Sequence, residues 1–340
     1  MKKQILLLYL YTMIGLLLAS CSAPSEQSDR IAAKPLFRDP VYDGAADPVV
    51  IWNRHENKWL MFYTNRRANA EGLDGVTWVH GTRIGIAESS DYGLTWQYRD
   101  TCDIQYRPDA EFSHWAPEVI EHDGTYHMYL TYVPGIFTDW NHPRNIIHLT
   151  STNLINWNYE STLKLANDKV IDACVMQMPD GNWRMWYNNE KDGKSIYYAD
   201  SPDLYDWQDK GKAVGDQGGE GPVVFAWKNK YWMITDVWQG LAVYQSDDLS
   251  NWQRIPGNLL EQPGSGPDDQ VKGGHPYVVV SNDRAYLFYF THPGRIDSIP
   301  ESDWYEKRRS SIQVVELKYE NGQIVCDRDA PTFIELQQNR

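Results

Sequence analysis

The sequence has few basic residues and few cysteines. Its 340 residues contain 32 Lys plus Arg against 46 Asp plus Glu, which gives a formal net charge of -14 at pH 7. A nucleic-acid-binding protein needs a basic face to meet the phosphates, so this balance argues against such a partner. The four cysteines form no Cys-x-x-Cys pair. Their number and spacing therefore indicate no zinc site, no iron–sulfur site and no disulfide framework.

Long stretches of helical periodicity are also absent after residue 40, as is a glycine-rich loop that would cradle a phosphate at the start of a helix. We therefore expect a fold without a helical core and an activity that requires no cofactor. Aromatic residues are abundant and make up 13% of the chain. Their rings suit half-buried strands, and they also suit stacking against the flat faces of sugars.

The one long apolar run lies at the N-terminus. Lys2 and Lys3 precede the run from Ile5 to Leu18, which is too short to span a bilayer comfortably. Together with the small residues that follow, this pattern predicts a secretory signal over residues 1–20. The Leu-Ala-Ser-Cys segment that ends at Cys21 resembles the lipobox of bacterial lipoproteins. That resemblance implies lipidation of Cys21, whereas the alternative is a plain cleaved signal with an incidental cysteine.

The chain after residue 40 repeats about every 50 residues. Each unit holds a strand-like run, a second alternating run and a third run, and most units place a polar hairpin turn after the first. Three or four short strands per unit, repeated five times, are the signature of an all-β, five-bladed β-propeller. We expect a tether over residues 21–35, the propeller over residues 36–331 and a C-terminal tail over residues 332–340.

A tryptophan recurs near the end of each of the first four units, where an Asp or Asn precedes it by four or five residues. The pairs are Asp91 and Trp96, Asn153 and Trp157, Asp203 and Trp207, and Asp248 and Trp252. The fifth unit lacks this tryptophan, as a terminal unit can. Because the tryptophans follow the repeat, we expect them to pack between blades rather than to bind sugar.

Ionisable residues recur near the start of the first strand of each unit. In a propeller these strands lie nearest the central channel, so equivalent residues converge on one axis. The five that we take as equivalent are Asp47, Glu118, Asp172, Glu220 and His275. Crowded carboxylates cannot ionise independently, and the repeat itself does not require them. They are therefore candidates for function.

Such an acidic ring fits two kinds of site. One is a cation site built from oxygens and an imidazole. The other is a pair of carboxyl groups that hydrolyses a glycosidic bond, one giving a proton to the leaving oxygen and the other taking a proton from water. A third carboxylate can raise the pKa of the acid by like-charge repulsion.

The motifs that open the five units resemble those of glycoside hydrolase family 43. In chain order they are Asp-Pro at 47–48, Trp-Ala-Pro-Glu at 115–118, Ile-Asp at 171–172, Glu-Gly-Pro at 220–222 and Gly-His at 274–275. The resemblance covers roughly residues 40–300. It implies the five-bladed propeller of a clan that also includes families 32, 62, 68, 117 and 130-like folds.

The resemblance also implies roles for these residues. Asp47 would be the general base, Asp172 would tune pKa values and orient groups, and Glu220 would be the general acid of an inverting reaction. His275 matches the position that helps hold a central ion, often calcium, through waters. For Glu118 it implies a contact with substrate, or with a residue that binds substrate, rather than a catalytic role.

The long segments 65–83, 134–145 and 293–310 exceed what a hairpin needs, and such loops usually carry specificity. They hold Trp78, His80 and Arg295, and two further tryptophans, Trp115 and Trp238, lie beside the axial motifs. We expect the tryptophans, and Trp140 as well, to be candidate sugar platforms. The His80 and Arg295 side chains can bond hydroxyls or a carboxylate on the sugar.

From the residues and the resemblance together we expect an inverting glycosidase that acts on plant or algal polysaccharide fragments, with arabinofuranosyl or xylosyl linkages first. We also expect a monomer that is exported and anchored by lipid to the bacterial cell envelope, at the outer membrane or in the periplasm. Two alternatives stay open. One is a noncatalytic surface glycan-binding lipoprotein. The other is a family 117-like or 130-like enzyme with a different sugar specificity.

Overall fold

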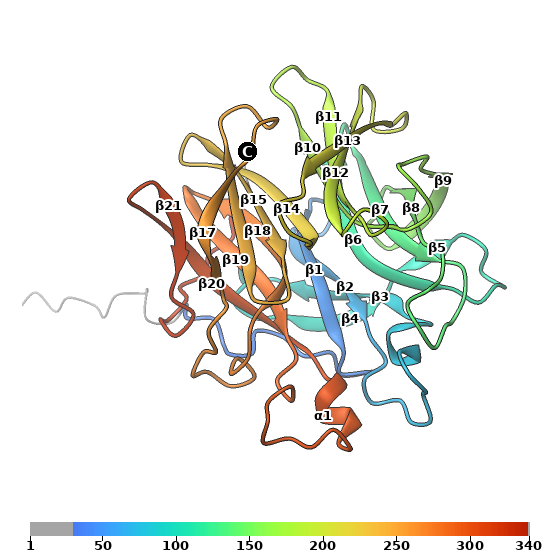
Figure 1. The fold of residues 1–340 in the computed structure, drawn as a ribbon, viewed down its shortest axis with the longest axis vertical. Helices are drawn as coiled ribbons and strands as arrows, with labels where there is room; N and C mark the ends of the chain where they lie inside the picture. Colours follow the sequence, from blue (N-terminus) through green and yellow to red (C-terminus); the bar gives the residue numbers. More distant parts are fainter. Residues whose placement is uncertain (1–29, 339–340) are drawn as a thin grey trace, which may run out of the picture.

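The computed structural model describes residues 30–338, in which almost all regular structure is β-sheet. Five sheets surround a common axis, each built from consecutive antiparallel strands, and the inner strands lie near the middle of the molecule (Figure 1). The five-bladed propeller predicted from the repeat is therefore confirmed. The signal over residues 1–20 and the lipidation of Cys21 lie outside the described residues. Within residues 30–338, no helix has the length and apolar character needed to cross a membrane.

The strands follow the chain from the axis outward in every blade. The first blade holds β1 (Ala45–Asn53), β2 (Lys58–Asn65), β3 (Arg83–Ser89) and β4 (Gln97–Thr101). The second holds β6 (Ser113–His122), β7 (Thr125–Val133), β8 (Asn145–Ser151) and β9 (Asn156–Thr162), with β5 (Asp103–Gln105) added in parallel at its outer edge. The third holds β10 (Val170–Gln177), β11 (Trp183–Asn189), β12 (Ser195–Ser201) and β13 (Gln208–Val214).

The last two blades have the same order. The fourth holds β14 (Glu220–Trp227), β15 (Lys230–Asp236), β16 (Leu241–Ser246) and β17 (Gln253–Leu259). The fifth holds β18 (Gly274–Ser281), β19 (Arg284–Thr291), β20 (Ser311–Glu320) and β21 (Gln323–Cys326). Two short helices sit in long loops: the 3₁₀ turn η2 (Thr77–Val79) between β2 and β3, and α1 (Trp304–Arg308) between β19 and β20.

The hydrophobic core lies between neighbouring blades rather than at one centre. Separate clusters of buried residues join blades one and two, blades two and three, blades three to five, and blades five and one. The repeated tryptophans belong to these layers. Trp157 meets Phe62 of the preceding blade edge-on at 6.1 Å, and Trp207 meets Tyr129 at 5.4 Å. The prediction that they pack between blades is confirmed.

The tryptophan repeat is accompanied by a repeated turn, which we call the outer turn. The third strands of the first four blades end at Ser89, Ser151, Ser201 and Ser246. In each case the hydroxyl accepts backbone N–H bonds from the next residues, and the Asp or Asn two positions on caps the following N–H groups, as at Ser246 and Asp248. These side-chain hydrogen bonds replace the backbone hydrogen bonds between strands at the point where the third strand ends.

Both ends of the described chain lie across the junction of blades five and one. Ala32 N–H donates to Thr332 O at 2.9 Å, and Ile31 forms a bridge with Phe333. Leu336 is fully buried, and its carbonyl accepts from Trp59 Nε1 at 3.1 Å. Residues 30–35 of the expected tether thus lie against the propeller rather than extending away from it. Residues 332–338 of the expected C-terminal tail likewise pack against the propeller, where Leu336 contacts Trp59 of the first blade.

Candidate active site

Each inner strand contains a β-bulge near its start, and the bulged residue has a positive φ. These residues are Asp47 (φ 54°), Ala116 (41°), Asp172 (58°), Gly221 (54°) and His275 (40°), and the strand register shifts at each of them. Bulges re-aim side chains and recur beside active sites. Positive φ is uncommon outside glycine, although Asp and His tolerate it better than most residues. We call these five positions the inner bulges.

The positions of the inner bulges show that the five axial residues predicted as equivalent are not all equivalent. Asp47, Asp172 and His275 do occupy equivalent positions. Glu118, however, lies two residues after its bulge at Ala116, and Glu220 lies one residue before its bulge at Gly221. A proline directly follows four of the five bulged residues, although the bulged residues themselves differ. The prolines therefore show which positions of the five inner strands are equivalent.

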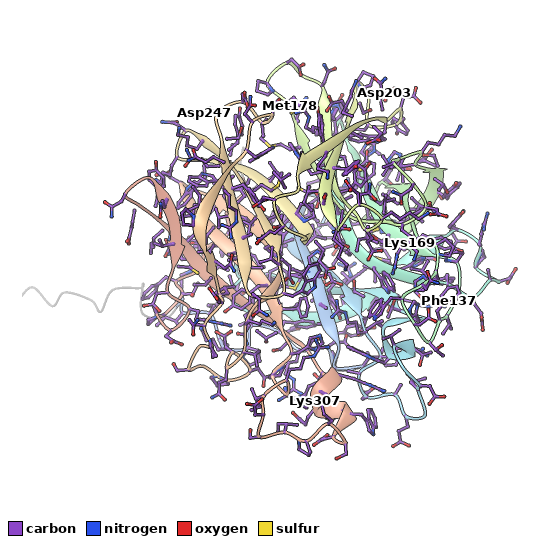
Figure 2. The ribbon with its side chains drawn as sticks, viewed as in Figure 1. Phe137, Lys169, Met178, Asp203, Asp247 and Lys307 are labelled. Atoms are coloured by element: carbon purple, nitrogen blue, oxygen red, sulfur yellow. The ribbon has the colours of Figure 1, made fainter. Side chains whose placement is uncertain are left out.

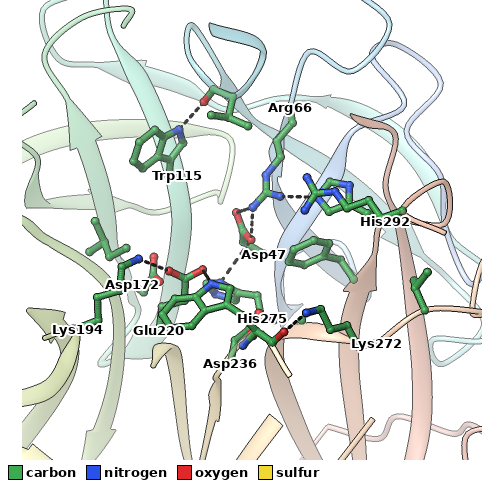
Figure 3. Close-up of a pocket in the computed structure, with 18 of the residues that line it drawn as sticks. Asp47, Arg66, Trp115, Asp172, Lys194, Glu220, Asp236, Lys272, His275 and His292 are labelled. Carbon is green, nitrogen blue, oxygen red and sulfur yellow. Dashed lines mark hydrogen bonds and ion pairs between the residues drawn. The ribbon is translucent and has the colours of Figure 1, made fainter. Parts of the chain in front are cut away.

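A pocket with a volume of about 1050 Å³ opens over this end of the propeller. Asp47, Asp172 and Glu220 all line it, so the structure brings the three predicted catalytic carboxyl groups together. Figure 3 shows them around one opening, with Arg66 on one side and Lys194 on the other. They come from the first, third and fourth blades, and only closure of the propeller unites them.

Asp47 is held as a carboxylate. Arg66 Nη2 lies 2.9 Å and 3.2 Å from its two oxygens, and His275 Nδ1 lies 3.4 Å from Oδ1. Burial alone would raise the pKa of Asp47, but the charges of Arg66 and then His275 outweigh it and hold that pKa below its ordinary value. Arg66 is itself oriented by His292, whose Nε2 lies 3.1 Å from Arg66 Nη1.

The pKa of Asp172 is shifted in the opposite direction. Burial, followed by the charges of Glu220 and Asp47, raises the pKa of Asp172 well above its ordinary value. Its Oδ2 accepts a 3.0 Å bond from the N–H of Gly221, the residue directly after Glu220. Its own N–H donates to Thr131 Oγ1 at 3.1 Å. The site therefore favours the ionised form of Asp47 and the protonated form of Asp172.

Glu220 is more open to solvent than Asp47, with 26% of its side chain exposed against 6%. Lys194 Nζ lies 3.4 Å from Oε2, and Trp238 Nε1 lies 3.3 Å from Oε1. Lys194 Nζ also lies 4.6 Å above the Trp238 ring. An accessible carboxyl beside a partly exposed indole suits contact with a sugar oxygen, because the ring can support the sugar face.

A fourth carboxyl group, Asp236, lines the same pocket and was missed in the sequence. It pairs in register with Glu220 across β14 and β15. Its Oδ2 accepts from His275 N–H at 2.9 Å, and its Oδ1 accepts from Trp238 N–H at 2.7 Å. Burial, and then the charge of Glu220, raise the pKa of Asp236 to about 7.

The sequence did carry a signal for Asp236. Thr64 and Thr131 stand at the same register position of β2 and β7, and each accepts the N–H of the next blade's bulge. Asp236 accepts the bulge N–H of His275 in the same way. No sequence pattern indicated the roles of Arg66, Lys194 and His292, because the segments that hold them follow no repeat.

All four of the predicted platform tryptophans line the pocket, but they differ in access. Trp238 is 37% exposed, whereas Trp78 and Trp115 are nearly buried. Trp140, at 53% exposed, also lines it. Arg295 lines the pocket too, as predicted.

Two predicted substrate contacts lie outside the pocket. His80 is fully buried, bonds Ser113 Oγ at 3.1 Å and packs against the Trp115 ring at 5.1 Å. Glu118 is buried below the pocket, where its Oε1 accepts from Val175 N–H at 2.9 Å. Burial raises the pKa of Glu118 to about 8. Neither side chain reaches the cavity, because loop packing covers His80 and the bulge at Ala116 shifts the register of Glu118.

His275 lies on the axis with its ring close to Gly221, where an added Cβ would come within 2.9 Å of Nδ1. Residues 30–338 bring together no group of three or more His, Cys, Asp or Glu side chains suited to a metal ion. Calcium takes 6–8 oxygen ligands, and His275 with Asp47 supplies few. The ion held through waters that the resemblance implies stays a prediction.

Comparison with known proteins places the fold. No protein-family model matches the sequence, and no curated protein matches it. Among solved structures, a thermostable family 43 glycoside hydrolase is 18% identical, with a TM-score of 0.65 over 89% of this chain and 100% of that one. A family 43 β-xylosidase/α-arabinofuranosidase from a compost metagenome, in complex with xylotriose, is 16% identical, with a TM-score of 0.57 over 83% and 93%.

A third similar structure belongs to another family of the clan. The Bombyx mori family 32 β-fructofuranosidase is 14% identical, with a TM-score of 0.62 over 88% of this chain and 67% of that one. The protein thus has the five-bladed propeller fold seen in glycoside hydrolase families 43 and 32. At these identities the likeness establishes the architecture.

Proposed function

We propose that this protein is a glycoside hydrolase that inverts the anomeric centre. The observation that carries the proposal is the shared pocket lined by the carboxyl groups of Asp47, Asp172 and Glu220, in which the surroundings lower the pKa of Asp47 and raise that of Asp172 while Glu220 is partly exposed. Glycoside hydrolysis needs a carboxylate and a carboxylic acid at the same time, and a noncatalytic binding protein needs neither. Structural likeness to family 43 and family 32 hydrolases supports the same class.

In the proposed reaction, Asp47 accepts a proton from a water molecule as the water oxygen bonds to the anomeric carbon. The bond between that carbon and the leaving oxygen breaks, and Glu220 gives its proton to the leaving oxygen. Arg66 and His275 favour the ionised form of Asp47 before the reaction. The donated proton is the one that Glu220 carries when the substrate binds, and Asp172 positions Glu220, because the Asp172 Oδ2 atom accepts the N–H of the adjacent Gly221.

For the substrate we propose plant or algal polysaccharide fragments with xylosyl or arabinofuranosyl linkages. The name of the β-xylosidase/α-arabinofuranosidase with bound xylotriose supports these sugars. The exposed Trp238 beside Glu220 can act as the platform for one sugar ring. We further propose that the protein acts as an exported, lipid-anchored monomer, which the N-terminal sequence pattern supports.

The mechanism is tested by Asp47→Asn and Glu220→Gln on a panel of xylan, arabinan, pectin and galactan fragments. Loss of general acid or base help should lower kcat by about 10²–10⁴-fold in each variant. Aryl glycosides with good leaving groups should recover much of the Glu220→Gln activity, because they need less protonation. NMR of the first-formed anomer should show inversion.

Asp123→Asn is the matched control for Asp47→Asn, because Asp123 also has a positive φ but lies in an exposed hairpin turn. Its activity should equal that of the unchanged protein. The mechanism is wrong if Asp47→Asn and Glu220→Gln both keep near-normal turnover, and inversion is wrong if the first product retains its anomeric configuration.

A further inference from the structure

A second cavity adjoins the candidate active site. Its volume is about 510 Å³, within the usual range for ligand pockets, and it shares Trp78, Arg295, Ile296 and Asp297 with the larger pocket. Its outer wall is formed by the loop between β19 and β20, including α1. Figure 2 shows Lys307 of this wall at the edge of the molecule opposite Asp203 and Asp247.

The second cavity holds two guanidinium groups without a carboxylate partner. Among the described residues, neither Arg295 nor Arg308 lies within ion-pair distance of an acid, whereas Lys307 Nζ pairs with Glu301 at 2.9 Å. In the larger pocket, by contrast, Arg66 pairs with Asp47 and Arg144 with Glu190. Two unpaired guanidinium groups beside one cavity stand out in a chain with a net charge of -14.

Both guanidinium groups are fixed in place by bonds to the backbone. Arg295 Nε donates to Lys307 O at 3.2 Å, and Arg308 Nη2 donates to Leu73 O at 2.9 Å. Arg308 also lies over the Trp304 ring at 5.1 Å and the Trp78 ring at 5.9 Å. The positions of these cations are thus set in advance, which reduces the entropy lost when a ligand is bound.

Arg66 adds to the positive charge around Arg295 on the side of the catalytic pocket. The groups packed around the Arg295 guanidinium, and then the charge of Arg66, lower the pKa of this partly accessible side chain, whereas the charge of Glu301 raises it. Arg295 and Arg66 in turn hold the pKa of His292 well below its ordinary value, after the larger effect of burial. An anion placed beside Arg295 would relieve this repulsion, and a guanidinium group binds a planar carboxylate or a sulfate through paired N–H bonds.

We infer that the second cavity is a subsite for a sugar unit that carries an anionic substituent, either a uronic acid carboxylate or a sulfate ester. The two arginines bind the anion, and Trp78 and Trp304 supply apolar surface for the ring. This inference rests on the proposed function, because it takes the adjoining pocket as the place where the glycosidic bond is cleaved.

The test compares three sets of oligosaccharides that share one backbone: neutral, uronate-bearing and sulfated. We expect the unchanged protein to have a kcat/KM at least tenfold higher for one acidic set than for the neutral set. The preferred set identifies the anion. Arg295→Gln should lower that acidic-to-neutral ratio at least tenfold, and rising salt should shrink the ratio, because it screens exposed charges.

Arg107→Gln is the matched control. Arg107 also lacks an ion-pair partner among the described residues, but it lines neither cavity. It should leave the acidic-to-neutral ratio unchanged. Arg308→Gln should act like Arg295→Gln, and its thermal unfolding midpoint shows whether it folds. The inference is overturned if Arg295→Gln changes all three sets equally or if the neutral set is preferred.

Calorimetric binding of the same sugars separates this inference from the proposed function. If no glycoside is cleaved but an acidic set binds and Arg295→Gln abolishes that binding, the subsite stands and the proposed hydrolase activity fails. If neutral glycosides are cleaved without any preference for acidic ones, the hydrolase stands and the subsite fails. Phosphate-dependent release of a sugar phosphate would also overturn the subsite, because the arginines would then bind the nucleophile.

Discussion

The inner bulges and the outer turns are two repeated features of the same blades, and they differ in what is repeated. At the outer turns, both the backbone and the side chains recur: a serine, an Asp or Asn two residues on, and a tryptophan. At the inner bulges the backbone recurs, but its side chains are Asp, Ala, Asp, Gly and His. The outer turns therefore serve the architecture, whereas the inner bulges present different chemistry on one backbone.

The strain at the inner bulges supports this distinction. A positive φ costs a non-glycine residue of the order of 1–3 kcal/mol, and such strain clusters at functional sites. Asp47, Asp172 and His275 all bear it, and all three line the pocket. The outer turns also place one residue at positive φ, such as Leu249 (63°), but there the serine hydroxyl compensates by accepting two N–H groups.

Among the changes that test this comparison, the largest effect is expected from filling the space at an inner bulge. Gly221→Ala would place a Cβ 2.9 Å from Nδ1 of His275, so the ring that now contacts Asp47 must shift. We expect kcat/KM to fall about 100-fold, since misplacement of about 1 Å can cost that much. Steady-state kinetics on the best substrate of the panel measures it.

Gly181→Ala is the control for that variant. Gly181 also has a positive φ (91°), but nothing lies within 4 Å of its added Cβ. It should lower stability by about 1 kcal/mol through backbone strain and leave kcat/KM unchanged. Equal kinetic losses in the two variants would show that the bulge geometry has no special bearing on the site.

A smaller effect is expected two residues beyond a bulge, at Glu118. Its pKa is raised to about 8 by burial, so between about pH 4.5 and 8 the folded protein retains a proton that the unfolded chain has released. Raising the pH in this window therefore favours unfolding. Glu118→Gln keeps the acceptor for Val175 N–H and removes this dependence.

Relative to Glu118→Gln, the unchanged protein should thus lose about 2 kcal/mol of unfolding free energy between pH 5 and pH 7. Urea unfolding of both proteins at the two pH values measures the difference. Exposed Glu71 provides the control substitution, Glu71→Gln, which should follow the unchanged protein. Parallel pH curves for Glu118→Gln and the unchanged protein would contradict the prediction. A large loss of activity in Glu118→Gln would indicate that Glu118 takes part in the active site.

The smallest effect is expected at an outer turn. Ser246→Ala removes the buried hydroxyl that accepts the N–H groups of Asp248 and Leu249. We expect a loss of about 1–2 kcal/mol in unfolding free energy, with kcat/KM unchanged, because unmade buried bonds cost about that much. Ser90→Ala, at an exposed serine of the first outer turn, should be neutral. A lower kcat/KM in Ser246→Ala would contradict the inference that the outer turns serve only the architecture.

The repeat in the chain made the blades and their interfaces predictable from the sequence, whereas the loop contacts, which follow no repeat, were not. The period revealed the five blades, and the outer tryptophans were assigned correctly to the blade interfaces. Glu118 was misplaced because it was aligned by its acidic character rather than by Pro117, which marks the bulge. His80 was misplaced because nothing in a loop sequence reveals that Ser113 and Trp115 enclose it.

The sequence by itself determined the propeller and most of the acidic residues on its axis, because each blade is encoded locally by alternating strands and turns. Only the tertiary structure decided which carboxyl groups share a pocket and which cations face them. Arg66 meets Asp47 within one blade, but His275, Glu220 and Asp172 come from three others. Charges interact through space, and the distances between blades exist only once the ring has closed.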